Sequence, residues 1–118
     1  ARAHCRAICG EMHSGFVSLR SALPMNLKAH YPGHKVWGGA LPDIERVLEI
    51  WSECLATYGG PFLFGKKRCM ADAMFAPVAS RFLTYGVPLD AAHLIGALSS
   101  VRSYCSMQWR AMSSGVAR

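Results

Sequence analysis

The run GKKRCMADAMFAPV, residues 65–78, places an acidic side chain, Asp72, inside an otherwise apolar segment. A carboxylate that leaves water costs free energy unless it is paired or hydrogen-bonded, so Asp72 must either do chemistry or satisfy backbone groups. The spacing from Cys69 to Asp72 is that of a capping box, in which the N3 carboxylate accepts a hydrogen bond from the backbone N–H of the N-cap residue. The pattern therefore predicts that Cys69 and Asp72 form a structural cap, with a thiol as the weak acceptor where Ser or Thr is usual.

A second group of chemically capable side chains, Cys5, Cys9 and His13, recurs every four residues and would share one face of a helix. Thiolates and imidazoles are zinc ligands. Because each helical turn rises about 5.4 Å, three ligands in a row lie too far apart to meet one tetrahedral ion. We therefore expect no metal site here and interpret these residues as core or interface contacts.

A cysteine nucleophile with a histidine base is an alternative that the composition leaves open. Nothing in the sequence selects one of the five cysteines, and free cysteines are usually buried and unreactive. His30 and His34 lie in a segment rich in Pro and Gly, where we expect them to be exposed. No residue of the chain is therefore predicted to be catalytic.

The charge balance, net +6, arises from dispersed cations, and the one basic run is Lys66-Lys67-Arg68. We expect this run to be a solvated loop; the alternative is a patch for phosphate or an acidic partner. No stacking aromatic residues alternate with these cations, so nucleic acid is not an expected partner.

An odd number of cysteines without a CxxC pair indicates a reducing compartment, which predicts a cytoplasmic protein. Apolar runs long enough to cross a bilayer are absent from the sequence, so no membrane association is expected.

The first element that could position these residues is a helix predicted over Ala1 to Leu23. Its apolar residues fall three and four positions apart, on one helical face: Ile8, Met12, Phe16, Leu19 and Leu23. Pro and Gly residues between positions 24 and 39 then predict a loop.

Two further helices follow. The second begins at Pro42, which suits a first helical turn, and ends before the glycines at 59 and 60. The third is predicted from Met70 to Tyr85, with a kink at Pro77. A fourth helical region is expected from Asp90 onwards. No segment shows sustained strand alternation, and PFLFG, residues 61–65, is interpreted as a loop. The predicted fold class is therefore all-α, a bundle of four to six helices.

Two segments resemble the C-terminal helical domain of soluble glutathione S-transferases. GGPFLFGKKRCMADAMFAPV, residues 59–78, is similar to the start of the central buried helix of that domain, where the family carries a Ser/Thr-x-x-Asp box before an apolar run. Cys69 departs from this box and Asp72 matches it. RAICGEMHSGFVSLRSALPMN, residues 6–26, resembles the first helix of the domain in bacterial, zeta-like members.

This resemblance implies that residues 1–118 form one glutathione S-transferase C-terminal-like domain, and that the family's N-terminal thioredoxin-like domain is missing from this sequence. We expect the sequence to be a piece of a longer protein. The intact protein would conjugate glutathione, as co-substrate, to small electrophiles, and no other cofactor is expected. The helical domain would supply the substrate pocket and the contact of a homodimer. The alternative is a non-enzymatic helical module that binds another protein.

The resemblance also places the first helix beside the substrate cleft, and this implies a role in substrate binding for Met12, Phe16 and Arg20. These residues lie four apart on the predicted helix, and core packing alone is the simpler explanation for the two apolar ones. Arg20 differs because a cation on an apolar stripe requires a partner. We expect that partner to be an acidic group of the missing domain or a carboxylate of the substrate.

Overall fold

The computed structural model describes residues 1–90 of the 118-residue chain. They fold into four α-helices, α1 (Arg2–Ser14), α2 (Val17–Ala22), α3 (Leu41–Tyr58) and α4 (Met70–Thr84), with a 3-10 turn, η1 (Gly38–Ala40), before α3. No strand occurs in this part of the chain, and its only β-pairing is a single bridge between Phe62 and Gly65. The all-α class is therefore confirmed for the described residues. The helical region predicted from Asp90 onwards lies outside them.

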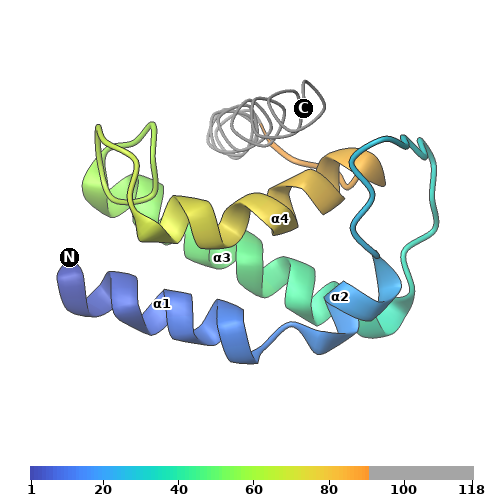
Figure 1. Ribbon diagram of the computed structural model, residues 1–118, viewed down its shortest axis with the longest axis horizontal. Coiled ribbons are helices and arrows are strands. Elements are labelled where there is room, and N and C mark those ends of the chain that lie inside the picture. Colours follow the sequence, from blue (N-terminus) through green and yellow to red (C-terminus); the bar gives the residue numbers. More distant parts are fainter. Residues whose placement is uncertain (91–118) are drawn as a thin grey trace, which may run out of the picture.

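The three long helices lie alongside one another (Figure 1). α1 and α4 run in the same direction and pack together, while α3 runs the opposite way beneath α4. α2 continues past the end of α1 and contacts η1 and α3. Apart from α2, each helix is long enough to bury one apolar face against the other two, which is what their sequence patterns require.

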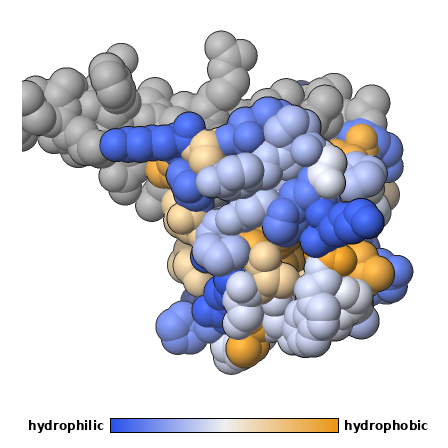
Figure 2. Space-filling model, turned by 90° about the vertical axis from the view of Figure 1, so that its right-hand side faces the viewer, coloured by the Kyte–Doolittle hydropathy of each residue, from blue (hydrophilic) through white to orange (hydrophobic). Residues whose placement is uncertain are grey.

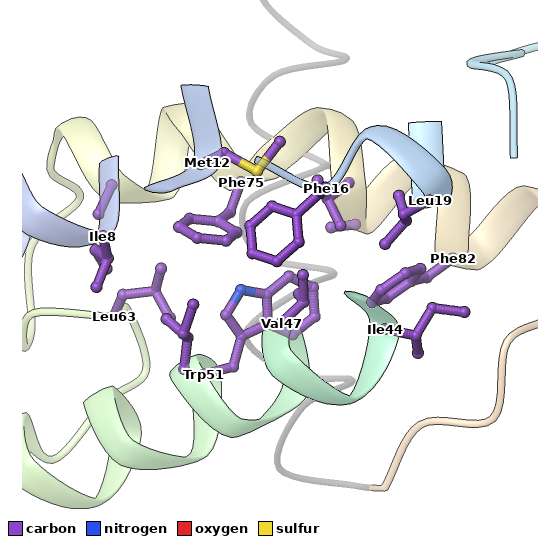
Figure 3. Packing of buried hydrophobic residues seen from close by; sticks show 14 of the residues in the cluster. Ile8, Met12, Phe16, Leu19, Ile44, Val47, Trp51, Leu63, Phe75 and Phe82 are labelled. Atoms are coloured by element: carbon purple, nitrogen blue, oxygen red, sulfur yellow. The ribbon is translucent and has the colours of Figure 1, made fainter. Parts of the chain in front are cut away.

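The core lies where these faces meet (Figure 3). The Trp51 ring of α3 contacts two α4 rings, edge-on to Phe75 with centroids 6.2 Å apart and tilted against Phe82 at 5.6 Å. Other side chains that are fully buried in this core are Leu19, Leu23, Val47, Ile50, Cys54 and Val78. The apolar face predicted for the first helix, from Ile8 to Leu23, is thus buried against α3 and α4.

The single helix predicted over Ala1 to Leu23 is wrong, because the chain breaks between α1 and α2. Gly15 is extended, and Phe16 adopts a left-handed conformation with φ 59°. A Cβ atom on Gly15 would lie 2.7 Å from the Glu11 carbonyl oxygen, so this turn needs a glycine. The apolar spacing nevertheless places Leu19 in the core, because the break redirects the helix without reversing it.

The other helix boundaries follow the predicted signals. α3 has Pro42 in its first turn, and it ends at Gly59, which takes the left-handed C-cap conformation with φ 79°. α4 is continuous through Pro77 and ends one residue before the predicted Tyr85. Pro and Gly signals located these ends because they act through backbone geometry that tertiary packing cannot change.

The loop between α2 and η1 is attached to the end of α4. The Tyr31 N–H donates to the Thr84 carbonyl at 2.7 Å, and the Tyr85 hydroxyl donates to the Pro24 carbonyl at 2.7 Å. The Tyr31 and Tyr85 rings stack with centroids 5.7 Å apart. As expected, His30 and His34 are exposed. Within residues 1–90, no helix combines the length and the apolarity that crossing a bilayer requires.

Candidate functional site

Asp72 is buried at the start of α4, with only 3% of its surface exposed. One carboxylate oxygen accepts the Cys69 N–H at 2.8 Å, and the other accepts the Leu63 N–H at 3.0 Å. The Cys69 sulfur in turn faces the N–H of Asp72, which completes the capping box. Asp72 therefore accepts backbone hydrogen bonds from both ends of the loop before α4, and each of its two carboxylate oxygens already has a donor.

The cysteines in the described residues are free thiols, and three of them are held in the protonated form. Burial raises the pKa of Cys9, Cys54 and Cys69 to about 11 in each case. Since the thiolate is the nucleophilic form, these side chains are poor nucleophiles at neutral pH. The structure thus favours packing over catalysis for the cysteines.

The spacing of Cys5, Cys9 and His13 raised the question of a metal site. Cys9 is buried in the core and Cys5 packs against its edge, whereas His13 is exposed at the last turn of α1. Across residues 1–90, no three His, Cys, Asp or Glu side chains converge as metal ligands would. Instead, His4 on the same helix meets the Tyr58 hydroxyl at 3.0 Å and packs edge-on against the Phe64 ring.

A cavity of about 280 Å³ lies between the end of α1, α2 and the middle of α4. Its walls are Met12, His13, Arg20, Ala73, Met74, Pro77 and Arg81. The apolar part of the wall is formed by Met12 on α1 with Met74 and Pro77 on α4. The polar part consists of the basic side chains His13, Arg20 and Arg81.

Of the three residues that the resemblance assigned to substrate binding, Met12 and Arg20 line this cavity and Phe16 does not. Phe16 is 6% exposed, and its ring points into the core from the turn between α1 and α2 (Figure 3). Its burial agrees with its place on the apolar face that runs from Ile8 to Leu23.

Arg20 is held at the C-terminal end of α1. Its Nη2 group donates to the Gly15 carbonyl, and the His13 and Met12 carbonyls lie 3.4 Å and 3.5 Å away. These are carbonyls that the end of a helix leaves without partners, and a cation is stabilised there by the helix dipole. The position of Arg20 beside the cavity is therefore fixed by the backbone of α1.

Arg81 lies opposite, on α4, and was not singled out by the sequence. Burial lowers the pKa of its guanidinium, and the positive charge of Arg20 lowers it further. The signal that could have identified it is its isolation, because Arg81 is the one cation in the mostly apolar sequence of α4.

Comparisons of this chain with protein-family models, with curated proteins and with solved structures found no match. The function must therefore be argued from the capped helix α4 and from the cavity that it forms with α1 and α2.

Proposed function

We propose that the chain is a helical domain like the C-terminal domain of glutathione S-transferases, and that it forms one wall of the site where glutathione is added to a small electrophile. The observation that carries this proposal is the cavity between α1 and α4. Met12 and Arg20, assigned to substrate binding by resemblance, both line it, together with Met74 and Pro77 from the helix that carries the capping box.

The contribution of such a wall to the reaction is positioning. Met12, Met74 and Pro77 offer an apolar surface to the substrate, and burial of apolar area stabilises the complex by about 25 cal/mol per Å². A substrate held beside a reactive thiolate gains rate from proximity without any acid or base from this wall. In the family, the thioredoxin-like domain binds glutathione and activates its thiol. The protein would act as a homodimer in which two such domains pair.

The test uses the full-length gene product that contains this chain, with glutathione and 1-chloro-2,4-dinitrobenzene as substrates. Met74→Ala removes apolar wall from the cavity, and we expect the KM for the electrophile to rise about tenfold for a loss near 1.4 kcal/mol. Met70→Ala, on the exposed first turn of α4, is the matched control and should leave KM unchanged. Melting temperatures of both variants exclude unfolding as the cause.

Absence of conjugation in the full-length protein with a panel of electrophiles would contradict the proposal. An equal rise of KM in both methionine variants would contradict the location of the site.

A second candidate function, a non-enzymatic module that binds another protein, is favoured by the exposure of Trp37. Its side chain is 63% exposed and lies across Gly39, where a Cβ atom would come within 2.4 Å of the indole ring. Exposed tryptophans are frequent anchors of protein interfaces. A full-length protein that lacks conjugation but binds a protein partner through Trp37, with binding lost in Trp37→Ala, would support this candidate over the enzyme.

A further inference from the structure

The cavity between α1, α2 and α4 has an unbalanced charge. Three of its seven wall residues are basic, His13, Arg20 and Arg81, and none is acidic. Elsewhere in the described chain, partly buried charges are matched. Arg46 pairs with Glu11 and Glu49, and Asp43 accepts the Leu19 N–H at 3.0 Å. The cavity is thus the place where cations face one another without a counter-charge.

The Nε atom of Arg81 is buried and has no hydrogen-bond partner within residues 1–90. No carboxylate of this part of the chain pairs with its guanidinium either. Buried polar groups are nearly always hydrogen-bonded, whereas Arg81 as a whole is only partly buried. Arg81 also lines the cavity, so the other N–H groups of its guanidinium can donate to an acceptor that enters there.

Arg20 has the same feature. Its Nη2 group is occupied by the carbonyls at the end of α1, but its Nε is buried and has no partner among the described residues. Arg20 is fixed in place by those carbonyls, so it cannot turn toward solvent without giving them up. Arg20 and Arg81 therefore line one cavity from two helices, and neither has a carboxylate partner among the described residues.

A long arginine can also bury its methylene stem along an apolar surface and leave its charged head in water. That explanation accounts for the stems of Arg20 and Arg81 beside Met12 and Met74. It does not account for two such heads at one cavity whose wall contains no acidic residue.

We propose that this cavity binds the carboxylate of a small organic acid between Arg20 and Arg81, with the apolar part of the acid against Met12, Met74 and Pro77. Guanidinium groups present planar pairs of N–H donors that match a carboxylate. The cavity volume of about 280 Å³ falls at the small end of ligand pockets. This inference deepens the proposed function and rests on it, since it names the class of electrophile that the wall would select.

The test uses the complete 118-residue chain and two probes of the same shape, cinnamate and the neutral cinnamamide, in isothermal titration calorimetry. Cinnamate should bind at least tenfold more tightly than cinnamamide, and the difference should shrink as sodium chloride is added. In ¹H–¹⁵N spectra, the Nε–H resonances of Arg20 and Arg81 should move when cinnamate is added and stay in place with cinnamamide.

Arg81→Met is the informative variant, because methionine keeps the apolar stem and removes the charge. It should reduce cinnamate affinity at least tenfold, to the level of cinnamamide, while its melting temperature stays equal to or above that of the wild type. Arg68→Met, in the exposed basic run, is the matched control and should leave both affinities unchanged. Arg20→Met is less informative, since Arg20 also holds the end of α1.

Equal binding of cinnamate and cinnamamide, or no binding of either, would overturn the proposal. An equal loss of cinnamate affinity in Arg68→Met and Arg81→Met would also overturn it, because the loss would then come from the lower net charge of the protein and not from the cavity. The calorimetry contains no glutathione, so the two proposals can fail separately. Cinnamate binding without conjugation in the full-length protein would support the anion site and contradict the transferase proposal. Conjugation of neutral electrophiles without cinnamate binding would support the transferase proposal and contradict the anion site.

Discussion

Asp72 shows how one side chain can hold two segments of backbone. Its carboxylate accepts N–H groups from Leu63 and Cys69, and it is almost completely buried. Asp72→Ala should lower the free energy of unfolding by about 2–4 kcal/mol, because two buried donors lose a charged acceptor. Asp72→Asn keeps one acceptor oxygen and should lose about half as much. Urea denaturation measures both, and a Asp72→Ala variant as stable as the wild type would contradict the capping role.

Cys69 combines a capping position with a poor capping atom. Cys69→Ser replaces the sulfur with a stronger acceptor for the Asp72 N–H and should raise stability by up to about 1 kcal/mol. Cys54→Ser is the matched control. Cys54 is completely buried among apolar residues of α3, so the same change there should destabilise the fold. A lower melting temperature for Cys69→Ser would show that Cys69 acts chiefly as an apolar contact.

The sequence was informative about these residues to different degrees. The Cys69–Asp72 spacing predicted the cap because a capping box is local and needs only one helical turn. The sequence alone also marked Arg20, as a cation on an apolar stripe. Arg81 was missed, because its importance comes from facing Arg20 across the cavity, and that depends on the parallel packing of α1 and α4. Phe16 was assigned to the substrate site by resemblance alone, whereas its apolar spacing already favoured the core position that it takes.

At the scale of helices, apolar spacing predicted the buried face that runs from Ile8 to Leu23, and Pro and Gly predicted the start and end of α3. The apolar spacing did not predict that the first helix is divided into α1 and α2. The spacing from Ile8 to Leu23 continues across the break, because Gly15 and Phe16 change the path of the chain without moving Leu19 from the core. A period of 3.6 residues reports which side chains are buried, and a single left-handed residue inside it leaves no trace in that pattern.

Two glycines of this region should respond oppositely to alanine. Gly10 lies inside α1 with open space where a Cβ would be, so Gly10→Ala should stabilise the protein by about 0.5–1 kcal/mol. Gly15→Ala should destabilise it, because its Cβ would lie 2.7 Å from the Glu11 carbonyl oxygen. Thermal denaturation of the pair tests the break directly. Equal stabilisation by both changes would mean that α1 and α2 form one helix.

An ion pair between Arg46 and Glu11 joins α3 to α1, with an Nε–Oε1 distance of 2.7 Å. The bond to Arg46 lowers the pKa of Glu11 below its ordinary value of 4.5. Its contribution to stability is therefore fully present above pH 4.5 and is lost as the pH falls through the lowered pKa. Because both side chains are partly exposed, Glu11→Gln should cost only about 0.5 kcal/mol at neutral pH.

The measurement is urea denaturation of wild type and Glu11→Gln from neutral pH into the acid range below the ordinary glutamate pKa. The two curves should converge at the acid end. Glu49→Gln, which removes the more exposed partner of Arg46 within α3, should have a smaller effect at neutral pH. A Glu11→Gln effect that does not change with pH would show that the pair acts through packing.

The whole molecule carries more apolar residues than most domains of its size, 52% of the chain. Several large ones are exposed on the described part: Val17, Met25, Leu27, Tyr31, Trp37, Leu41 and Met70. Figure 2 shows the end of the molecule with α2 and the long loop, where hydrophobic residues form separate spots among hydrophilic ones. A contact with a second molecule that buries several such spots would be stabilised by about 25 cal/mol for each Å² of apolar surface removed from water.

We therefore predict that the 118-residue chain associates with itself and, alone, has no glutathione transferase activity. No strand occurs in residues 1–90, so this part of the chain holds no thioredoxin-like unit to bind glutathione and activate its thiol. A thiol near its ordinary pKa of about 8.5 is mostly protonated at neutral pH. Sedimentation equilibrium and a chlorodinitrobenzene assay on the same sample test both parts. A strictly monomeric chain would contradict the first. Turnover that survives dialysis and disappears in one cysteine variant would contradict the second.

The bonds of Asp72 also constrain how the molecule opens. Leu63 and Cys69 lie at either side of the exposed Lys66-Lys67-Arg68 run, and their amides reach the same carboxylate inside α4. The loop before α4 therefore cannot fluctuate open unless the first turn of α4 opens with it. Its anchoring amides belong to the same cooperative unit as the core, and their hydrogens should exchange with solvent as slowly as those of the helix, although the basic residues between them remain in water.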